Sequence, residues 1–172
     1  MCWKRKRPCS GFTLLELMIV VTIIGLLAVM AIPAVWKARR RSQNTAFVND
    51  LRILSGSVFE EYAIFKGDYP PEAAPGVVPA GIDEYLNPRV DWAEGPPIGG
   101  LWDWDRAPTR DQPLHGCYAG LSVHLPSRTS SQMRDIDARI DDGNLNTGNF
   151  RRKFNGYIYI LEHSSPTNSP GG

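Results

Sequence analysis

Few side chains in this 172-residue chain are placed by their spacing to do chemistry. The three histidines, His115, His124 and His163, do not fall into a metal-binding helix motif, and no serine lies in a Gly-x-Ser-x-Gly turn. We therefore expect structural or surface roles for the histidines. The sequence predicts that the protein is not an enzyme.

One acidic group near the C-terminus offers hard oxygen ligands, which are the kind that Ca²⁺ prefers. Its members are Asp135, Asp137, Asp141, Asp142 and Asn144. Their spacing does not match the EF-hand pattern, and the run 141–144, which contains Gly143, also fits a turn that closes a helix. Calcium binding is thus a hypothesis, with a solvated turn as the simpler alternative.

A single acid interrupts the most apolar stretch of the chain. Between residues 12 and 36, Glu16 is the one ionisable side chain. A helix of this length exceeds the roughly 30 Å hydrocarbon core of a bilayer, so the stretch can span a membrane. A carboxylate inside such a span costs about 2.5 to 3.5 kcal/mol at the centre and is normally retained with a partner. Glu16 therefore needs a cation.

The residues around Glu16 closely resemble a known signal. The run Gly11-Phe12-Thr13-Leu14-Leu15-Glu16 follows a basic leader, with Lys4, Arg5, Lys6 and Arg7, and precedes an apolar helix that contains Pro33. This arrangement resembles the class III signal of type IV pilins and of the pseudopilins of type II secretion.

The resemblance implies a path of processing and assembly. A prepilin peptidase would cut after Gly11 and methylate the amine of Phe12, and Glu16 would pair with that amine in an adjacent subunit. The protein would cross the inner membrane once, with its leader in the cytoplasm and its head in the periplasm. It would then join copies of itself and other pilin-like subunits in a pilus or pseudopilus, through an inner-membrane assembly platform. Pro33, 21 positions after Phe12, marks a place where the filament helix could bend or lose regularity.

An uncleaved anchor is the alternative. Basic residues lie at both ends of the span, with Lys37, Arg39, Arg40 and Arg41 after it, so their number does not set the orientation. In this alternative the chain is a monomeric, signal-anchored periplasmic binding module that recognises a protein or a glycan. An aromatic platform of Trp92, Trp102 and Trp104 would serve a glycan.

The cysteines and the net charge narrow the possibilities. Cys2 and Cys9 would leave with the leader, so Cys117 would have no partner for an intrachain disulfide. Many type IV pilins close a C-terminal loop with a disulfide, and this departure favours a pseudopilin. Some major pseudopilins hold calcium in a C-terminal loop, which supports the calcium hypothesis. We expect Cys117 to be a small buried hydrophobe. Removal of the leader changes the formal charge from +1 to −3, which argues against nonspecific binding to nucleic acid.

Apolar residues with helical spacing continue beyond the span. They are Phe47, Leu51, Leu54, Val58, Tyr62 and Phe65, and they predict one buried face on a helix that runs from about residue 13 to 66. Gly67 ends this helix. The predicted parts are a cleaved leader over residues 1–11, a membrane and filament-core helix over 12–36, its amphipathic continuation over 37–66, and a head over 67–172 that begins with the loop 67–97.

The head shows three strand signals and one helix signal. Residues 101–105, 117–125 and 156–162 fit strands, residues 131–140 fit a short helix, and residues 82–86 fit a helical turn. In the first strand, Trp102 and Trp104 share one face, and we expect them to pack on the long helix while Asp103 and Asp105 face outward. The prediction is an α+β, pilin-like fold, with an antiparallel sheet of three or four strands on the second half of the helix.

Overall fold

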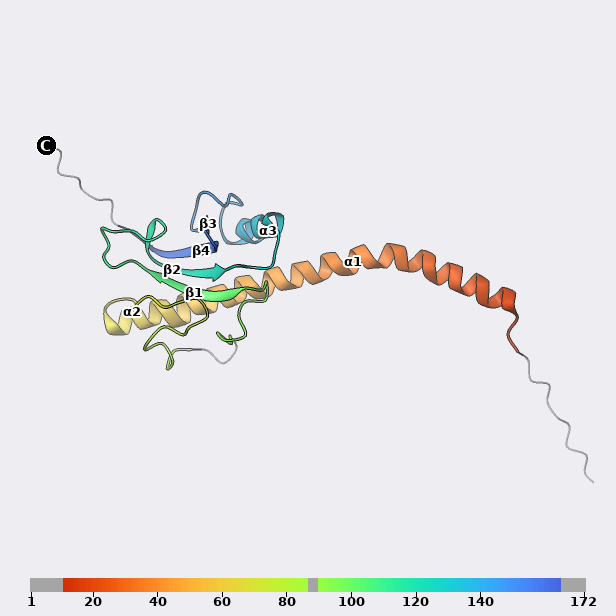
Figure 1. Ribbon diagram of the computed structural model, residues 1–172, viewed down its shortest axis with the longest axis horizontal. Coiled ribbons are helices and arrows are strands. Elements are labelled where there is room, and N and C mark those ends of the chain that lie inside the picture. Colours follow the sequence, from red (N-terminus) through yellow and green to blue (C-terminus); the bar gives the residue numbers. More distant parts are fainter. Residues whose placement is uncertain (1–10, 87–89, 165–172) are drawn as a thin grey trace, which may run out of the picture. The chain divides into compact units, whose positions relative to one another are not determined.

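The computed structural model describes residues 11–86 and 90–164, and divides the chain near Arg39 into two compact units (Figure 1). The elements are the helix α1 Leu14–Leu54, the π-helix η1 Ser55–Glu60, the helices α2 Glu61–Lys66 and α3 Ser130–Ile140, and four strands. The strands are β1 Leu101–Arg106, β2 Cys117–His124, β3 Phe150–Lys153 and β4 Gly156–His163. This is the predicted α+β fold, with one long N-terminal helix and an antiparallel sheet.

The first unit is the N-terminal part of α1, up to Arg39. Every residue from 11 to 39 is exposed. Within the described residues, one helical stretch is long and apolar enough to cross a membrane. It is the continuous run Leu14–Lys66, whose most apolar window has a mean hydropathy of 2.7 and is 0% buried. The apolar side chains of this unit therefore have no partner within the chain's own core.

The second unit, residues 40–172, contains the sheet in the order β1-β2-β4-β3, with all neighbours antiparallel. Figure 1 shows the sheet lying over the C-terminal part of the helix, with α3 beside it. Phe47 stacks on Trp102 at 5.6 Å between ring centroids, and Phe59 stacks on Trp104 at 3.8 Å. These two pairs join the helix to β1 at the centre of the core.

The π-helix η1 changes which residues the helix buries. Phe47, Leu51, Leu54 and Val58 are buried as predicted, but Phe59 is buried too and Phe65 is 71% exposed. The prediction for Phe65 is therefore wrong. A π turn holds more residues than an α turn, so it shifts the helical face and brings adjacent residues inward. Tyr62 stays half-buried, where its ring meets Tyr85 edge-on.

Three tryptophans of the head lie in the core, and Trp102 and Trp104 pack on the long helix as expected. Trp92, Trp102 and Trp104 are at most 3% exposed, so they do not form a surface platform for a ligand. The prediction for Asp103 and Asp105 needs correction, because these residues are 4% and 5% exposed. Their carboxylates lie 2.7 and 2.6 Å from Nζ of Lys153, and the Ser122 hydroxyl also lies within hydrogen-bond distance of both. These partners offset part of the cost of burying the two acids.

The end of the long helix, the turn at 82–86 and the short helix agree with the predictions, whereas one strand was not predicted. Gly67 ends the helix with φ 83°, and the N–H groups of Tyr85 and Leu86 bind the carbonyl of Ile82 in the predicted turn. The short helix appears as α3. The strand β3 was not predicted, because its sequence, Phe-Arg-Arg-Lys, has three consecutive basic residues and no apolar alternation.

Candidate functional site

A short exposed segment precedes α1. Gly11 and Phe12 lie in no helix or strand, and Phe12 is 83% exposed. A peptidase needs a backbone that is free of helix hydrogen bonds, and the bond between Gly11 and Phe12 meets this need. The remainder of the expected leader, residues 1–10, lies outside the described residues, and Cys2 and Cys9 lie there too.

Thr13 and Glu16 form a reciprocal capping box at the start of α1. The backbone N–H of Thr13 donates to Oε2 of Glu16 at 2.8 Å, and its hydroxyl donates to the same oxygen at 2.9 Å. The N–H of Glu16 in turn donates to Oγ1 of Thr13 at 3.2 Å. Two N–H groups that the helix leaves free are thereby satisfied. The Thr-x-x-Glu spacing signals such a box, and the sequence analysis missed it.

Glu16 has no cation of its own in the described part of the chain, where it forms no salt bridge. Its neighbours on the helix are exposed apolar side chains, among them Leu15, Leu17 and Met18, which are 55% to 66% exposed. The carboxylate therefore sits in an apolar surface, held by Thr13 alone. No cation among the described residues neutralises its charge.

Pro33 lies inside α1, and the helix remains continuous through it. Proline removes one backbone hydrogen bond and lets a helix bend at that point. The loss of regularity expected for the filament is absent from this single chain, where α1 is helical on both sides of Pro33.

Comparisons with known proteins point to one family. The family model described as "Prokaryotic N-terminal methylation motif" matches residues 6–32, which include Gly11, Phe12 and Glu16. Fimbrial protein EcpC of Eikenella corrodens is 41% identical over 91 residues, which cover 52% of this chain and 59% of that protein. Over its N-terminal part the chain is therefore similar to type IV pilins and to pseudopilins. Type II secretion system core protein G of Aeromonas hydrophila is 33% identical over 83 residues, 48% of this chain and 53% of that protein.

A third relative is the type IV wide pilus major component PilA4 of Thermus thermophilus, 47% identical over 47 residues. This match covers 26% of the chain and 36% of that protein. The chain thus spans less than two thirds of the length of each of these pilin and pseudopilin relatives. No solved structure matches the chain.

The acidic set predicted for calcium is not brought together as one site. Asp135 forms an ion pair with Arg40 on α1. Asp141 accepts from the N–H of Asn149, and Asp142 accepts from the N–H of Asn144 at 2.7 Å. Among described residues, no group of three or more His, Cys, Asp or Glu side chains is placed to hold a metal ion. As placed, the set does not fit a calcium site, although binding itself stays a prediction.

Asp137 is the unusual member of that set. Its side chain is fully buried, and neither carboxylate oxygen has a hydrogen-bond partner. Burial, reinforced by the charges of Asp142 and Asp141, raises the pKa of Asp137 to about 6. Asp137 therefore destabilises the folded head when it is ionised, and a proton relieves the cost.

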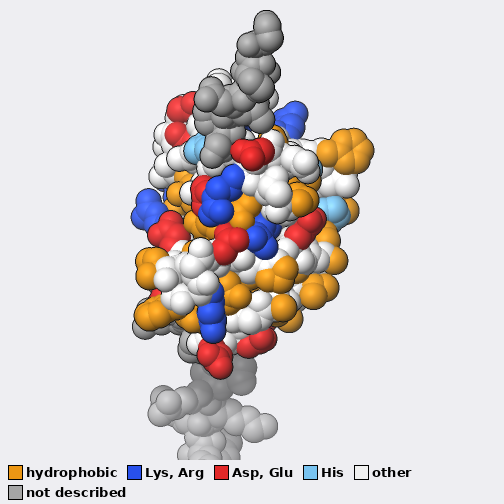
Figure 2. Space-filling view, turned by 90° about the vertical axis from the view of Figure 1, so that its left-hand side faces the viewer, with side chains coloured by type: hydrophobic (Ala, Val, Ile, Leu, Met, Phe, Trp, Pro, Cys, Tyr) orange, Lys and Arg blue, Asp and Glu red, His pale blue; other side chains and the backbone are white. Residues whose placement is uncertain are grey.

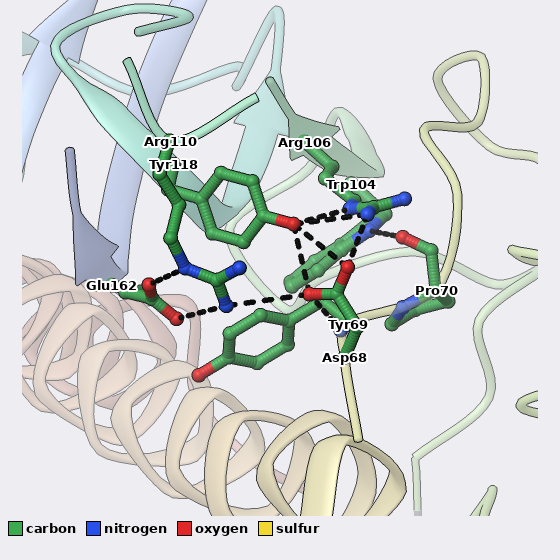
Figure 3. Close-up of polar contacts among 8 residues, drawn as sticks. All are labelled: Asp68, Tyr69, Pro70, Trp104, Arg106, Arg110, Tyr118 and Glu162. Atoms are coloured by element: carbon green, nitrogen blue, oxygen red, sulfur yellow. Dashed lines mark hydrogen bonds and ion pairs between the residues drawn. The ribbon is translucent and has the colours of Figure 1, made fainter. Parts of the chain in front are cut away.

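A second polar cluster fastens the chain after the long helix, and sequence reasoning missed it (Figure 3). The carboxylate of Asp68 accepts from the hydroxyl of Tyr118 at 2.8 Å and from Nη2 of Arg106 at 2.5 Å. Arg110 lies over the Tyr118 ring at 4.2 Å and pairs with Glu162 at 2.6 Å. The cluster joins the turn after α2 to β1, β2 and β4.

The cluster also sets the ionisation of its central acid. Burial acts to raise the pKa of Asp68, but the Tyr118 hydroxyl, the N–H of Tyr69 and the guanidinium groups of Arg106 and Arg110 outweigh it. The pKa of Asp68 consequently lies below its usual range. The residues of this cluster are far apart in the sequence, so no local spacing could have predicted it.

The free thiol of Cys117 lies in an environment that does not favour reaction. Cys117 is free and buried, and burial raises the pKa of its thiol to about 12. The interpretation of Cys117 as a small buried hydrophobe is confirmed.

Proposed function

We propose that this protein is a structural subunit of a type IV pilus or a type II secretion pseudopilus, without catalytic activity. A prepilin peptidase removes residues 1–11 and methylates the amine of Phe12. The subunit waits in the inner membrane with its head in the periplasm. An assembly platform then adds it to a filament with copies of itself and other pilin-like subunits.

The observation that carries this proposal is the position of Glu16. It is the one ionisable side chain between residues 12 and 36, a stretch in which every residue is exposed, and it forms no salt bridge with any described residue. Cleavage after Gly11 creates a cation at Phe12, four residues before Glu16. When helices pack side by side, the carboxylate of one can neutralise the amine of the next, which removes the cost of both charges in an apolar surrounding.

The test is Glu16→Ala in the native host, with filaments sheared from cells and viewed by electron microscopy. We expect normal membrane insertion and normal processing, measured as the intact mass, together with the loss of filaments. Glu16→Ala also removes the capping box, so the matched control is Thr13→Ala. This control removes the cap and keeps the carboxylate, and it should still give filaments.

Normal filaments from Glu16→Ala would contradict the proposed pairing. Loss of filaments from both variants would assign the defect to the start of the helix rather than to charge neutralisation. An intact mass that retains residues 1–11 would contradict processing and favour the anchored binding module. That alternative has lost its tryptophan platform, but a cavity of about 490 Å³ beside Asp103, Asp105 and Lys153 offers one place for a ligand.

A further inference from the structure

We propose that a ring of basic side chains directly after the apolar part of α1 binds the headgroups of anionic phospholipids. The basic ring consists of Lys37, Arg39 and Arg41, all exposed. The proposal rests on the proposed function in one respect, which is that the preceding helix spans a bilayer.

The basic ring surrounds the helix. Successive residues of an α-helix are 100° apart, so Lys37 and Arg41 lie on one side and Arg39 lies near the opposite side. A docked protein covers one side of a helix, whereas a layer of headgroups surrounds it. The arrangement therefore fits a lipid surface better than a single partner helix.

The three cations have no acid to pair with in the described part of the chain. None of them forms a salt bridge or a side-chain hydrogen bond there, whereas their neighbour Arg40 pairs with Asp135. The sequence has no acidic residue between Glu16 and Asp50. The basic ring thus presents free positive charge at the point where the apolar surface ends.

The dimensions match a headgroup layer. Trp36, 73% exposed, is the last residue of the apolar run, and tryptophan favours the interface between hydrocarbon and water. From Trp36 to Arg41 the helix rises about 7.5 Å, and the polar layer on each side of a bilayer is about 5 to 8 Å thick. All three cations therefore fall at headgroup depth when Trp36 marks the edge of the hydrocarbon.

The experiment compares lipid selectivity at the protein surface. The full chain is reconstituted in phosphatidylcholine bilayers, and spin-labelled phosphatidylglycerol and phosphatidylcholine are compared by their immobilised fraction. A basic residue near the surface is worth about a fivefold preference for anionic lipid, so we expect a clear selectivity for phosphatidylglycerol. The triple variant Lys37→Gln, Arg39→Gln, Arg41→Gln should reduce this selectivity at least several-fold, and added salt should weaken it in the wild type.

The matched control is Arg52→Gln, Lys66→Gln, Arg134→Gln, which removes the same charge from exposed positions of the head. It should keep the selectivity. An equal loss in the control, or none in the ring variant, would overturn the proposal. Chemical cross-linking between chains provides a second readout. A ring variant that keeps lipid selectivity but loses these cross-links would also overturn the proposal, since that result assigns the basic ring to a protein partner.

Insertion is scored separately by resistance to alkaline extraction. A chain that inserts and shows no selectivity contradicts the lipid contact alone and leaves the proposed function standing. A chain that fails to insert contradicts both, because the basic ring then has no bilayer beside it.

Discussion

The two units of the molecule treat their charges in opposite ways. In the head, Asp103 and Asp105 are almost fully buried and share the ammonium of Lys153 at 2.7 and 2.6 Å. In the N-terminal unit, Glu16 is exposed among apolar side chains, and among the described residues its carboxylate bonds to Thr13 alone. The head supplies a cation for these two buried carboxylates, whereas the described part of the N-terminal unit supplies none for Glu16.

The surfaces differ in the same way. Figure 2 shows charged side chains of both signs interleaved with apolar ones at one end of the head. The helix before Trp36 exposes an almost uninterrupted apolar surface. A water-facing surface must be mixed, while a helix that is apolar all round is typical of a membrane span or of a core formed with other helices. This contrast is what a subunit needs if one part is solvated and the other is completed by lipid or by copies.

The largest expected effect comes from removing the cation that the head's carboxylates share. Lys153→Met leaves Asp103 and Asp105 buried without their ammonium, with the Ser122 hydroxyl as a shared donor. Loss of a buried charge partner typically costs about 3 to 5 kcal/mol of the free energy of unfolding. The measurement is denaturant unfolding in detergent, followed by tryptophan fluorescence. The control Lys66→Met, at an exposed position, should change this free energy by less than about 0.5 kcal/mol.

A loss below about 1 kcal/mol in Lys153→Met would mean that water or another group already solvates the two carboxylates. The contrast between the two units would then concern apolar surface only, not charge.

Sequence reasoning was strongest where one period dominates. A single element is predicted from each of three patterns: the apolar run, the helical spacing from Phe47 to Val58, and the alternation around Trp102 and Trp104. The exposed position of Phe65 was not predicted, because helical spacing was extended from Val58 to Phe65 without a break. The π-helix η1, in which Val58 and Phe59 are both buried, shifts the buried face between them.

The polar features show the same limit. The unpaired acid Glu16 and the proposed cleavage site after Gly11 are both indicated by the order of neighbouring residues in the sequence. By contrast, Asp105 meets Lys153 and Asp68 meets Tyr118 across 48 and 50 positions, so their burial depends on the sheet's register. The capping box differs from these two contacts, because the local spacing Thr13-x-x-Glu16 is enough to predict it.

Asp137 is an exception within the head, and its pH dependence sharpens the contrast. Its pKa is raised to about 6 in the folded state, against 3.8 as the usual value. A raised pKa contributes stability that is complete below about pH 4 and is lost as pH rises through about 6. The loss at neutral pH amounts to about 3 kcal/mol.

We therefore expect Asp137→Asn to be more stable than the wild type at neutral pH and nearly equal to it at about pH 4. Unfolding free energies across this pH range provide the measurement. Asp111→Asn, at an exposed position, should follow the wild type throughout. A wild type and an Asp137→Asn variant with parallel pH profiles would show that Asp137 keeps an ordinary pKa.

The smallest expected change in stability comes from removing a threonine N-cap, which both α1 and α3 have. Thr129 caps α3, where its hydroxyl accepts from the N–H of Gln132 at 3.3 Å, while the Gln132 side chain donates to Asn44 of α1 at 2.8 Å. Thr129→Ala should cost the head about 1 kcal/mol in the same unfolding measurement. Thr13→Ala removes the equivalent cap from α1, yet the Thr13 side chain bonds only to Glu16 among the described residues, so the head should be unaffected. Equal destabilisation of the head by both variants would mean that the start of α1 and the head unfold together, and the N-terminal helix would then be part of the head's own stability.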